Sequence, residues 1–238
     1  MASNFPKPTI LLVQGSFQLP EVYGKLVSAL TAESFPVLHP SLPSLTDQER
    51  PDFASTTLTD DANVIQTELK RLVGSEATLE EFSWAKRREQ GLAGGVIHLL
   101  FFASIILPEG QSVISAFGES LNLDVKPGGR FTIRDAARAI YDDLPTEEAK
   151  YWESKIIDQS YAVQTTKLTQ AAYRYIPSTY IVCENDQSVP PAFQEQFGRS
   201  INATMDKINS GHSPMLSQTE KLVEMIAAVA QRAVATLK

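Results

Sequence analysis

The sequence predicts an α/β fold, in which a mostly parallel sheet is flanked by helices, and three observations support this. Short continuous apolar runs occur at 9–13, 96–106 and 178–183, as expected for strands that are covered on both faces. Each run ends in a turn that is rich in Gly, Pro or polar residues. The third observation is size, because 238 residues lie in the range that such folds cover as one domain.

The first part of the chain alternates between strand and helix patterns. Residues 9–13 predict the first strand, and Pro20 opens the helix that follows it. Residues 35–39 predict a second strand, and a Pro- and Ser-rich loop runs from 40 to 57. A helix is then predicted over 60–73, because Gly74 supplies a stop signal directly after its last apolar residue.

Residues 75–93 interrupt this alternation. A strand should follow the helix in a parallel α/β chain, yet this segment is charged and helix-prone and has no β pattern. Strand 96–106 then gives the strongest strand pattern in the sequence. We predict that it pairs beside strand 9–13, because a missing central strand would otherwise leave unpaired N–H and C=O groups that cost about 1–3 kcal/mol each.

The second part of the chain predicts a cap and the rest of the core. Residues 111–175 change to short helical patterns with scattered aromatic residues, which favours a helical cap over a site. An ordinary helical layer is the alternative. Strand 178–183 and an amphipathic helix at the end of the chain complete the core. We therefore expect one domain, with a core of 1–110 and 176–238 and a cap of 111–175.

Composition limits the classes of partner and compartment. The net charge is −7, and the only basic cluster is the run 86–88, which argues against nucleic acid and anionic membranes as partners. No apolar run is long enough to span a membrane, and the first residues lack the pattern of a signal peptide. The single cysteine, Cys183, cannot form an internal disulfide, and we expect it to be a buried core residue rather than a nucleophile. We expect a cytoplasmic protein without a metal or other cofactor, and a homodimer is left open.

Two turns in the last third of the chain hold the candidate catalytic residues. Asp186 follows strand 178–183, and His212 stands 26 residues later in a turn that contains Gly211 and Pro214. A carboxylate that orients an imidazole makes up two thirds of a nucleophilic triad in the chain order Ser, Asp, His. His98 lies inside a strand pattern, where a hydrogen-bonded core histidine is the better interpretation.

A resemblance to a known family rests on seven segments, which lie at 11–15, 93–99, 107–110, 141–145, 149–152, 176–184 and 210–214. In this order they resemble the single-domain α/β-hydrolases related to plant methylesterases and hydroxynitrile lyases, in particular their fungal and bacterial relatives. The resemblance implies that Asp186 is the triad acid, that His212 is the base, and that the Ser16 N–H is half of an oxyanion hole. Phe17 and Trp152 are then expected to line the pocket.

The same resemblance suggests the class of substrate. Relatives with Gly-His-Ser-Pro around the histidine resemble esterases of secondary metabolism, so we expect a small apolar ester, lactone or related metabolite. The lyases place a lysine directly after the triad histidine, whereas this chain has Ser213. Cyanohydrin cleavage is therefore not expected.

The family's Gly-x-Ser-x-Gly-like elbow has no counterpart between residues 74 and 94. Ser83 is the nearest serine, but Phe82 and Ala85 do not supply the small neighbours and entering strand that an elbow needs. Ser16 and Ser104 would attack from the wrong direction. The nucleophile is therefore unknown, and three accounts stay open. A segment is missing from this form of the sequence, the chain is an inactive ligand-binding or scaffold protein, or it is a non-covalent acid/base enzyme such as an isomerase, dehydratase or cyclase.

Overall fold

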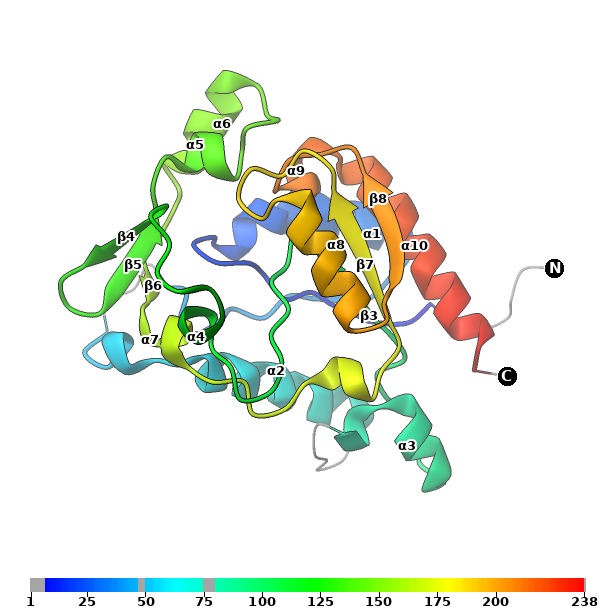
Figure 1. The fold of residues 1–238 in the computed structure, drawn as a ribbon. Helices are drawn as coiled ribbons and strands as arrows, with labels where there is room; N and C mark the ends of the chain where they lie inside the picture. The colour runs from blue at the N-terminus through cyan, green and yellow to red at the C-terminus, as the bar shows by residue number, and fades with distance from the viewer. Residues whose placement is uncertain (1–6, 47–49, 75–79, 238) are drawn as a thin grey trace.

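A computed structural model describes residues 7–46, 50–74 and 80–237 (Figure 1). Within these residues the parallel strands form two separate groups. One pairs β1 with β2, and the other has the order β3-β7-β8. Their bounds are β1 Ile10–Leu11, β2 Val37–Leu38, β3 Leu99–Phe102, β7 Ser178–Cys183 and β8 Thr204–Ile208. The parallel strands and their flanking helices confirm the predicted α/β class.

The predicted pairing of strand 96–106 beside strand 9–13 is wrong. In the described parts of the chain β1 pairs only with β2, and β3 only with β7, so the parallel sheet is interrupted between β1 and β3. Val96, at the start of the predicted strand, instead forms a parallel bridge with Ser83, in which the Val96 N–H donates to the Phe82 carbonyl at 2.7 Å. The two residues of β1 are half-buried, and Val13, which follows the strand, is 51% exposed.

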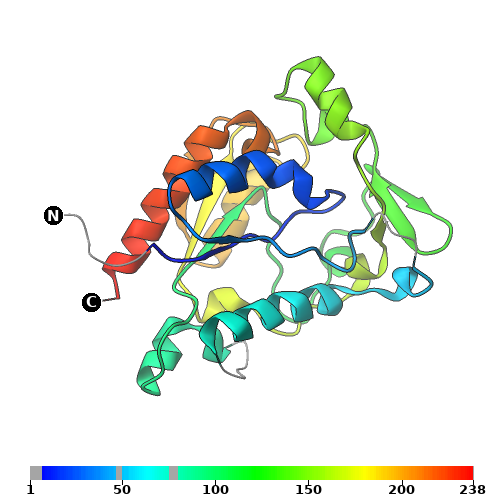
Figure 2. The same ribbon diagram turned by 180° about the vertical axis from the view of Figure 1, so that it is seen from behind.

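Helices cover both faces of the β3-β7-β8 group. Helices α1 (Gly24–Ala32) and α10 (Thr219–Ala235) pack against each other on one face, and α8 (Pro191–Ser200) covers the other (Figures 1 and 2). Leu222 and Val229 lie on the same buried face of α10, about two helical turns apart. Burial of each such side chain contributes about 1.5–3 kcal/mol, so this interface holds the two parts of the interrupted sheet in one core.

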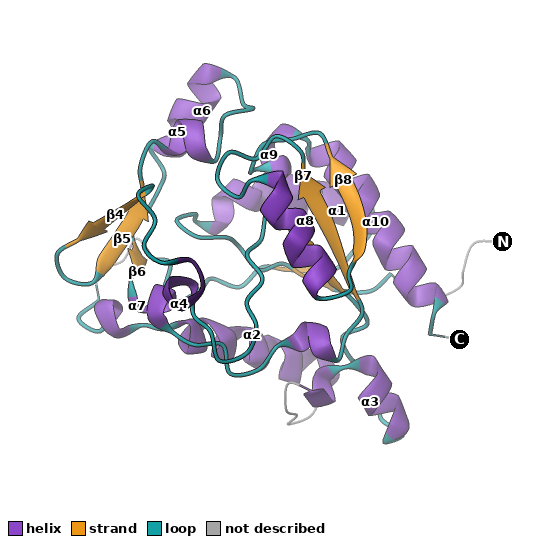
Figure 3. Ribbon diagram, viewed as in Figure 1, coloured by secondary structure: helices purple, strands orange, loops and turns teal. Residues whose placement is uncertain are grey.

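The cap region 111–175 is not purely helical, which corrects the predicted helical cap. It contains four short α-helices and an antiparallel sheet of order β4-β5-β6 (Figure 3). Gly128 and Gly129 adopt φ values of +78° and +69°, which makes the sharp reversal between β4 and β5 possible. The bounds are α4 Val113–Phe117, β4 Leu123–Lys126, β5 Arg130–Ile133, α5 Ala136–Ala139, α6 Thr146–Glu153, β6 Gln159–Ser160 and α7 Ala162–Thr165.

The remaining helices connect these parts. They are the 3-10 turns η1 Pro20–Tyr23, η2 Phe53–Ser55, η3 Glu80–Phe82 and η4 Ala172–Arg174, with the α-helices α2 Leu58–Val73, α3 Trp84–Glu89 and α9 Pro214–Ser217. Helix α2 ends as predicted, because Gly74 takes the left-handed conformation with φ of +67°. Among the described residues, none of the helices combines the length and the apolar character that crossing a bilayer would require.

Candidate active site

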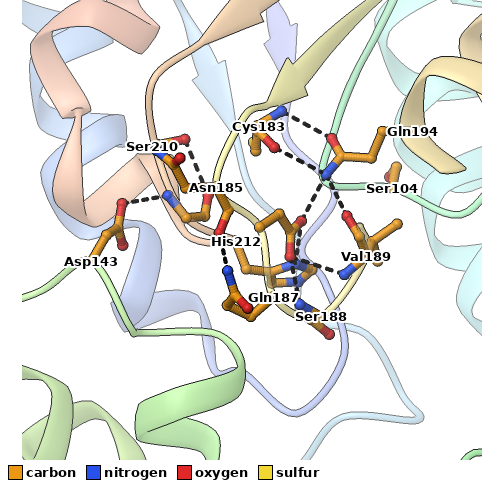
Figure 4. A network of polar contacts seen from close by, with 12 residues as sticks. Ser104, Asp143, Cys183, Asn185, Gln187, Ser188, Val189, Gln194, Ser210 and His212 are labelled. Carbon is orange, nitrogen blue, oxygen red and sulfur yellow. Dashed lines mark hydrogen bonds and ion pairs between the residues drawn. The ribbon is translucent and has the colours of Figure 1, made fainter. Parts of the chain in front are cut away.

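Asp186 and His212 meet beyond the carboxyl ends of β7 and β8. His212 Nδ1 lies 3.0 Å from Oδ1 and 2.9 Å from Oδ2 of Asp186 (Figure 4). A carboxylate can only accept, so Nδ1 donates its proton to Asp186 and Nε2 is left as the acceptor of the ring. The Asp186 side chain is fully buried, whereas 22% of the His212 side chain is exposed. The pair therefore combines a buried acid with a partly exposed imidazole.

The Asp186 carboxylate is held by three further donors. Oδ1 accepts the backbone N–H groups of Ser188 at 2.8 Å and Val189 at 2.9 Å, and Oδ2 accepts Gln194 Nε2 at 2.9 Å. Hydrogen bonds to a carboxylate are about twice as strong as those between neutral groups, so these donors hold the carboxylate firmly in place. Sequence reasoning missed Gln194. The available signal was a glutamine on a helix that begins at a Pro-Pro pair only a few residues after the candidate acid.

The histidine turn is bound by a carboxylate from the cap. The Gly211 N–H donates to Asp143 Oδ2 at 2.6 Å, from the segment between α5 and α6 (Figure 4). Its neighbour Asp142 lies against the same glycine. Burial raises the pKa of Asp142, the charges of Asp143 and Asp186 raise it further, and His212 opposes the shift. Neither aspartate was assigned a role from the sequence.

The loop after β1 contains the predicted oxyanion donor. Ser16 is exposed, and within the described residues its N–H has no hydrogen-bond partner. Phe17 is buried with φ of +66°. Its ring packs edge-on against the ring of Phe131 in the cap, with 5.1 Å between the ring centroids. Trp152 packs against the main core cluster and edge-on against Tyr151. In the described structure no hydrogen bond joins Trp152 to His212 or Asp186, so its pocket role stays a prediction.

Among the described residues, no serine hydroxyl is hydrogen-bonded to His212 Nε2. Ser83 is buried, and its Oγ accepts the Lys86 N–H at 3.3 Å as the N-cap of α3. It pairs with Val96, about 20 Å along the strand direction from the carboxyl end of β3. The backbone of Ser104 is bound by the Tyr180 hydroxyl, and no interaction joins its side chain to His212 (Figure 4).

The cysteine and the possible metal ligands can also be assessed. Cys183 is fully buried, and burial raises its pKa to about 12, so it is a neutral thiol rather than a nucleophile. Within the part of the chain that the structure describes, no group of three or more His, Cys, Asp and Glu side chains could hold a metal ion. The described site contains an imidazole that is oriented by a buried carboxylate.

Comparison with known proteins identifies the family. Residues 10–225 match the model of the "Alpha/beta hydrolase family". The chain is 30% identical over 246 residues to "Probable hydrolase R7" of Phoma sp., covering 94% of this chain and 98% of that protein. It is 26% identical over 250 residues to "Alpha/beta hydrolase nvfD" of Aspergillus novofumigatus, covering 96% and 98%.

A solved structure agrees with this assignment at the level of the fold. Polyneuridine aldehyde esterase matches with a TM-score of 0.72 and 16% identity, covering 95% of this chain and all of that one. The family match runs from β1 into the first half of α10 and so includes both turns of the candidate site. The chain belongs to the alpha/beta hydrolase family.

Proposed function

We propose that this chain hydrolyses small apolar esters or lactones with Asp186 and His212 as an acid/base pair and without a serine nucleophile. The observation that supports this most directly is the arrangement of His212. Its Nδ1 is bound to a buried carboxylate, and its Nε2 has no hydroxyl partner among the described side chains. Such an imidazole can accept a proton from water as readily as from a serine.

The proposed reaction is a direct attack by water. His212 Nε2 removes a proton while the water oxygen bonds to the carbonyl carbon. The C–O bond to the leaving alkoxide then breaks, and the alkoxide takes the proton from the imidazolium. The products are an acid and an alcohol, or one hydroxy acid from a lactone. The Asp186 carboxylate accepts from Nδ1 and stabilises the imidazolium, and the Ser16 N–H is a donor for the developing oxyanion.

Known magnitudes set the expected rate. A positioned general base contributes about 10²–10⁴-fold, and one oxyanion donor about 10²–10³-fold. These factors suffice for activated esters and strained lactones and are small beside the full effect of a serine triad. We therefore expect slow turnover of substrates with good leaving groups.

The comparisons support a hydrolase and a missing segment. Both curated relatives are named as hydrolases, and one structural neighbour is named as an esterase. The alignment with the Aspergillus protein has 250 positions, which exceeds the 238 residues of this chain. It therefore includes positions without a counterpart here. A deletion of the elbow segment would account for both this difference and the break between β1 and β3.

The test combines turnover with a covalent probe. Purified protein should hydrolyse p-nitrophenyl acetate, and His212→Ala should remove that activity, whereas His98→Gln should keep it. His98 is the matched control because it lies before β3, at the amino end of the strand, and bonds Thr179 at 2.9 Å. A fluorophosphonate that labels serine hydrolases should add no mass to the protein. Labelling of a serine would refute the non-covalent mechanism.

The second candidate is a ligand-binding protein without catalysis. The observation in its favour is the break in the sheet, because the Ser16 loop follows β1 and the His212 turn follows β8, on opposite sides of that break. A poorly aligned donor and base would still bind an apolar ester. Saturable binding with no turnover above the His212→Ala background would support this candidate. The sequence of the messenger across codons 74 to 94 would show whether a longer, active form exists.

A further inference from the structure

We infer that the cap segment Tyr141–Asp143 is a clamp that positions the histidine turn against the loop after β1. This inference concerns the same site as the proposed function and deepens it. The two loops belong to strand groups that share no hydrogen bonds within the described residues. The clamp contacts both loops, through the side chains of Tyr141 and Asp143, which are two positions apart in the sequence. Tyr141 and Asp143 are thus positioning residues and not catalytic ones.

Tyr141 provides the contact with the loop after β1. Its side chain is fully buried, and its hydroxyl accepts Gln18 Nε2 at 3.0 Å. Gln18 Oε1 accepts the Tyr23 hydroxyl at 2.8 Å, and that hydroxyl accepts the Gly15 N–H at 2.8 Å. Burial raises the pKa of Tyr141 to about 12, so the phenol keeps its proton at neutral pH. This chain of bonds fixes the backbone directly before Ser16.

Asp143 provides the contact with the histidine turn. Its Oδ2 accepts the Gly211 N–H at 2.6 Å, one residue before His212. Position 211 leaves no room for a side chain, since a Cβ there would lie 2.6 Å from Asp142 Oδ1 and 2.9 Å from Asp143 Cγ. The two carboxylates therefore rest directly on the glycine backbone. The absence of a Cβ at Gly211 permits this contact.

The interrupted sheet explains why such a clamp matters. In a continuous sheet, ladder hydrogen bonds would set the distance between the loops at the strand ends. Here α1 and α10 hold the two strand groups together through apolar packing. Apolar packing is not directional, whereas a hydrogen bond is. The cap segment adds directional bonds at the site itself. A misplacement of about 1 Å at a reacting centre can cost about 10²-fold in rate, so small shifts of the histidine turn are significant.

Two variants separate the clamp from general stability. Asp143→Ala removes the acceptor of the Gly211 N–H, and Gly211→Ala keeps both carboxylates but displaces them. Glu147→Ala is the matched control, because Glu147 is also a cap carboxylate and its side chain is 87% exposed. All three proteins are first compared by thermal unfolding. The chain has three histidines, so the ring signals of His212 can be assigned by their loss in His212→Ala.

The readout is the ¹⁵N-edited proton NMR signal of the His212 Nδ1–H and the exchange rate of the Gly211 amide. We expect Asp143→Ala and Gly211→Ala to lose the ring signal and to speed amide exchange while remaining folded, and Glu147→Ala to match the wild type. An unchanged His212 signal in both folded variants would overturn the clamp. If one variant does not fold, the other decides the question. No turnover is measured, so the clamp can fail while the proposed hydrolysis stands, or the reverse.

Discussion

Gln194 Nε2 lies 2.9 Å from Asp186 Oδ2, while Gln194 Oε1 accepts the Cys183 N–H at 3.0 Å. One fully buried amide therefore connects the end of β7 to the acid of the candidate site. The amide is suited to this position because it donates from one end and accepts at the other. Neither a carboxylate nor an apolar side chain of the same length could make both bonds. Gln194 is therefore a specific support for Asp186.

Gln194→Glu should destabilise the protein at pH 7 more than Gln194→Met does. Both variants lose the N–H donors, and a buried group left without a partner costs about 1–3 kcal/mol. Only the glutamate also places a second negative charge against Asp186. Urea unfolding should show this order at pH 7 and a smaller gap at pH 4, where a carboxylate in that position is protonated. A gap that is constant between the two pH values would contradict the electrostatic explanation.

Several elements could be predicted from local sequence signals. The run 178–183 became a fully buried strand, and the Gly74 stop signal coincides with the end of α2. Asp186 and His212 were found because each stands in a polar turn after a strand, and the structure brings them together. These features depend on periodicity and turn residues, which short stretches of sequence contain.

The features that were missed depend on contacts between distant residues. The cap sheet was not predicted, because strands of two to four residues give no clear alternating pattern. The pairing of Val96 with Ser83 was missed because only a single bridge forms there. Gln194 and Asp143 act through partners that the fold supplies, and a glutamine or aspartate in sequence does not reveal such a partner.

Ser83→Ala should leave turnover unchanged and lower the stability of α3. The hydroxyl caps the helix by accepting the Lys86 N–H, and loss of an N-cap costs about 0.5–2 kcal/mol. The residue is buried at the amino end of β3 and cannot reach His212. Ester hydrolysis and a thermal melt check the two parts of this prediction. Ser104→Ala is the companion variant, and a large loss of kcat in either one would identify a nucleophile and refute the proposed mechanism.

Tyr180→Phe should destabilise the turn that follows β3 by about 1–3 kcal/mol for each backbone group left unpaired. The Tyr180 hydroxyl donates to the Ser104 carbonyl and accepts the Ser104 N–H at 2.9 Å. Burial raises the pKa of this phenol, so the hydroxyl remains a donor at every pH near neutral. Equilibrium unfolding of the variant measures the cost. Tyr175→Phe, a tyrosine outside this contact, serves as the control, and equal stabilities for both variants would contradict the prediction.

Asp61→Asn should flatten the dependence of stability on pH. Asp61 is 5% exposed on α2, and its carboxylate accepts the Ser44 N–H at 2.9 Å and the Ser44 hydroxyl at 2.5 Å. Burial is the main cause that raises the pKa of Asp61, and these bonds only partly oppose it. The native protein therefore binds a proton at Asp61 more tightly than the unfolded chain does, and this contribution to stability is complete below the unfolded pKa of about 3.9.

As the pH rises through the higher native pKa of Asp61, that contribution is lost, so ionisation of this side chain weakens the fold near neutral pH. The amide introduced by Asp61→Asn cannot ionise and keeps an acceptor for the Ser44 N–H. The difference in unfolding free energy, variant minus wild type, should therefore increase between pH 4 and pH 7. Asp61→Ala leaves that N–H without its acceptor and should be about 1–3 kcal/mol less stable than Asp61→Asn throughout the range. Urea unfolding of the three proteins across these pH values tests the argument, and a variant difference that stays constant or falls with pH would show that burial of Asp61 does not oppose its charge.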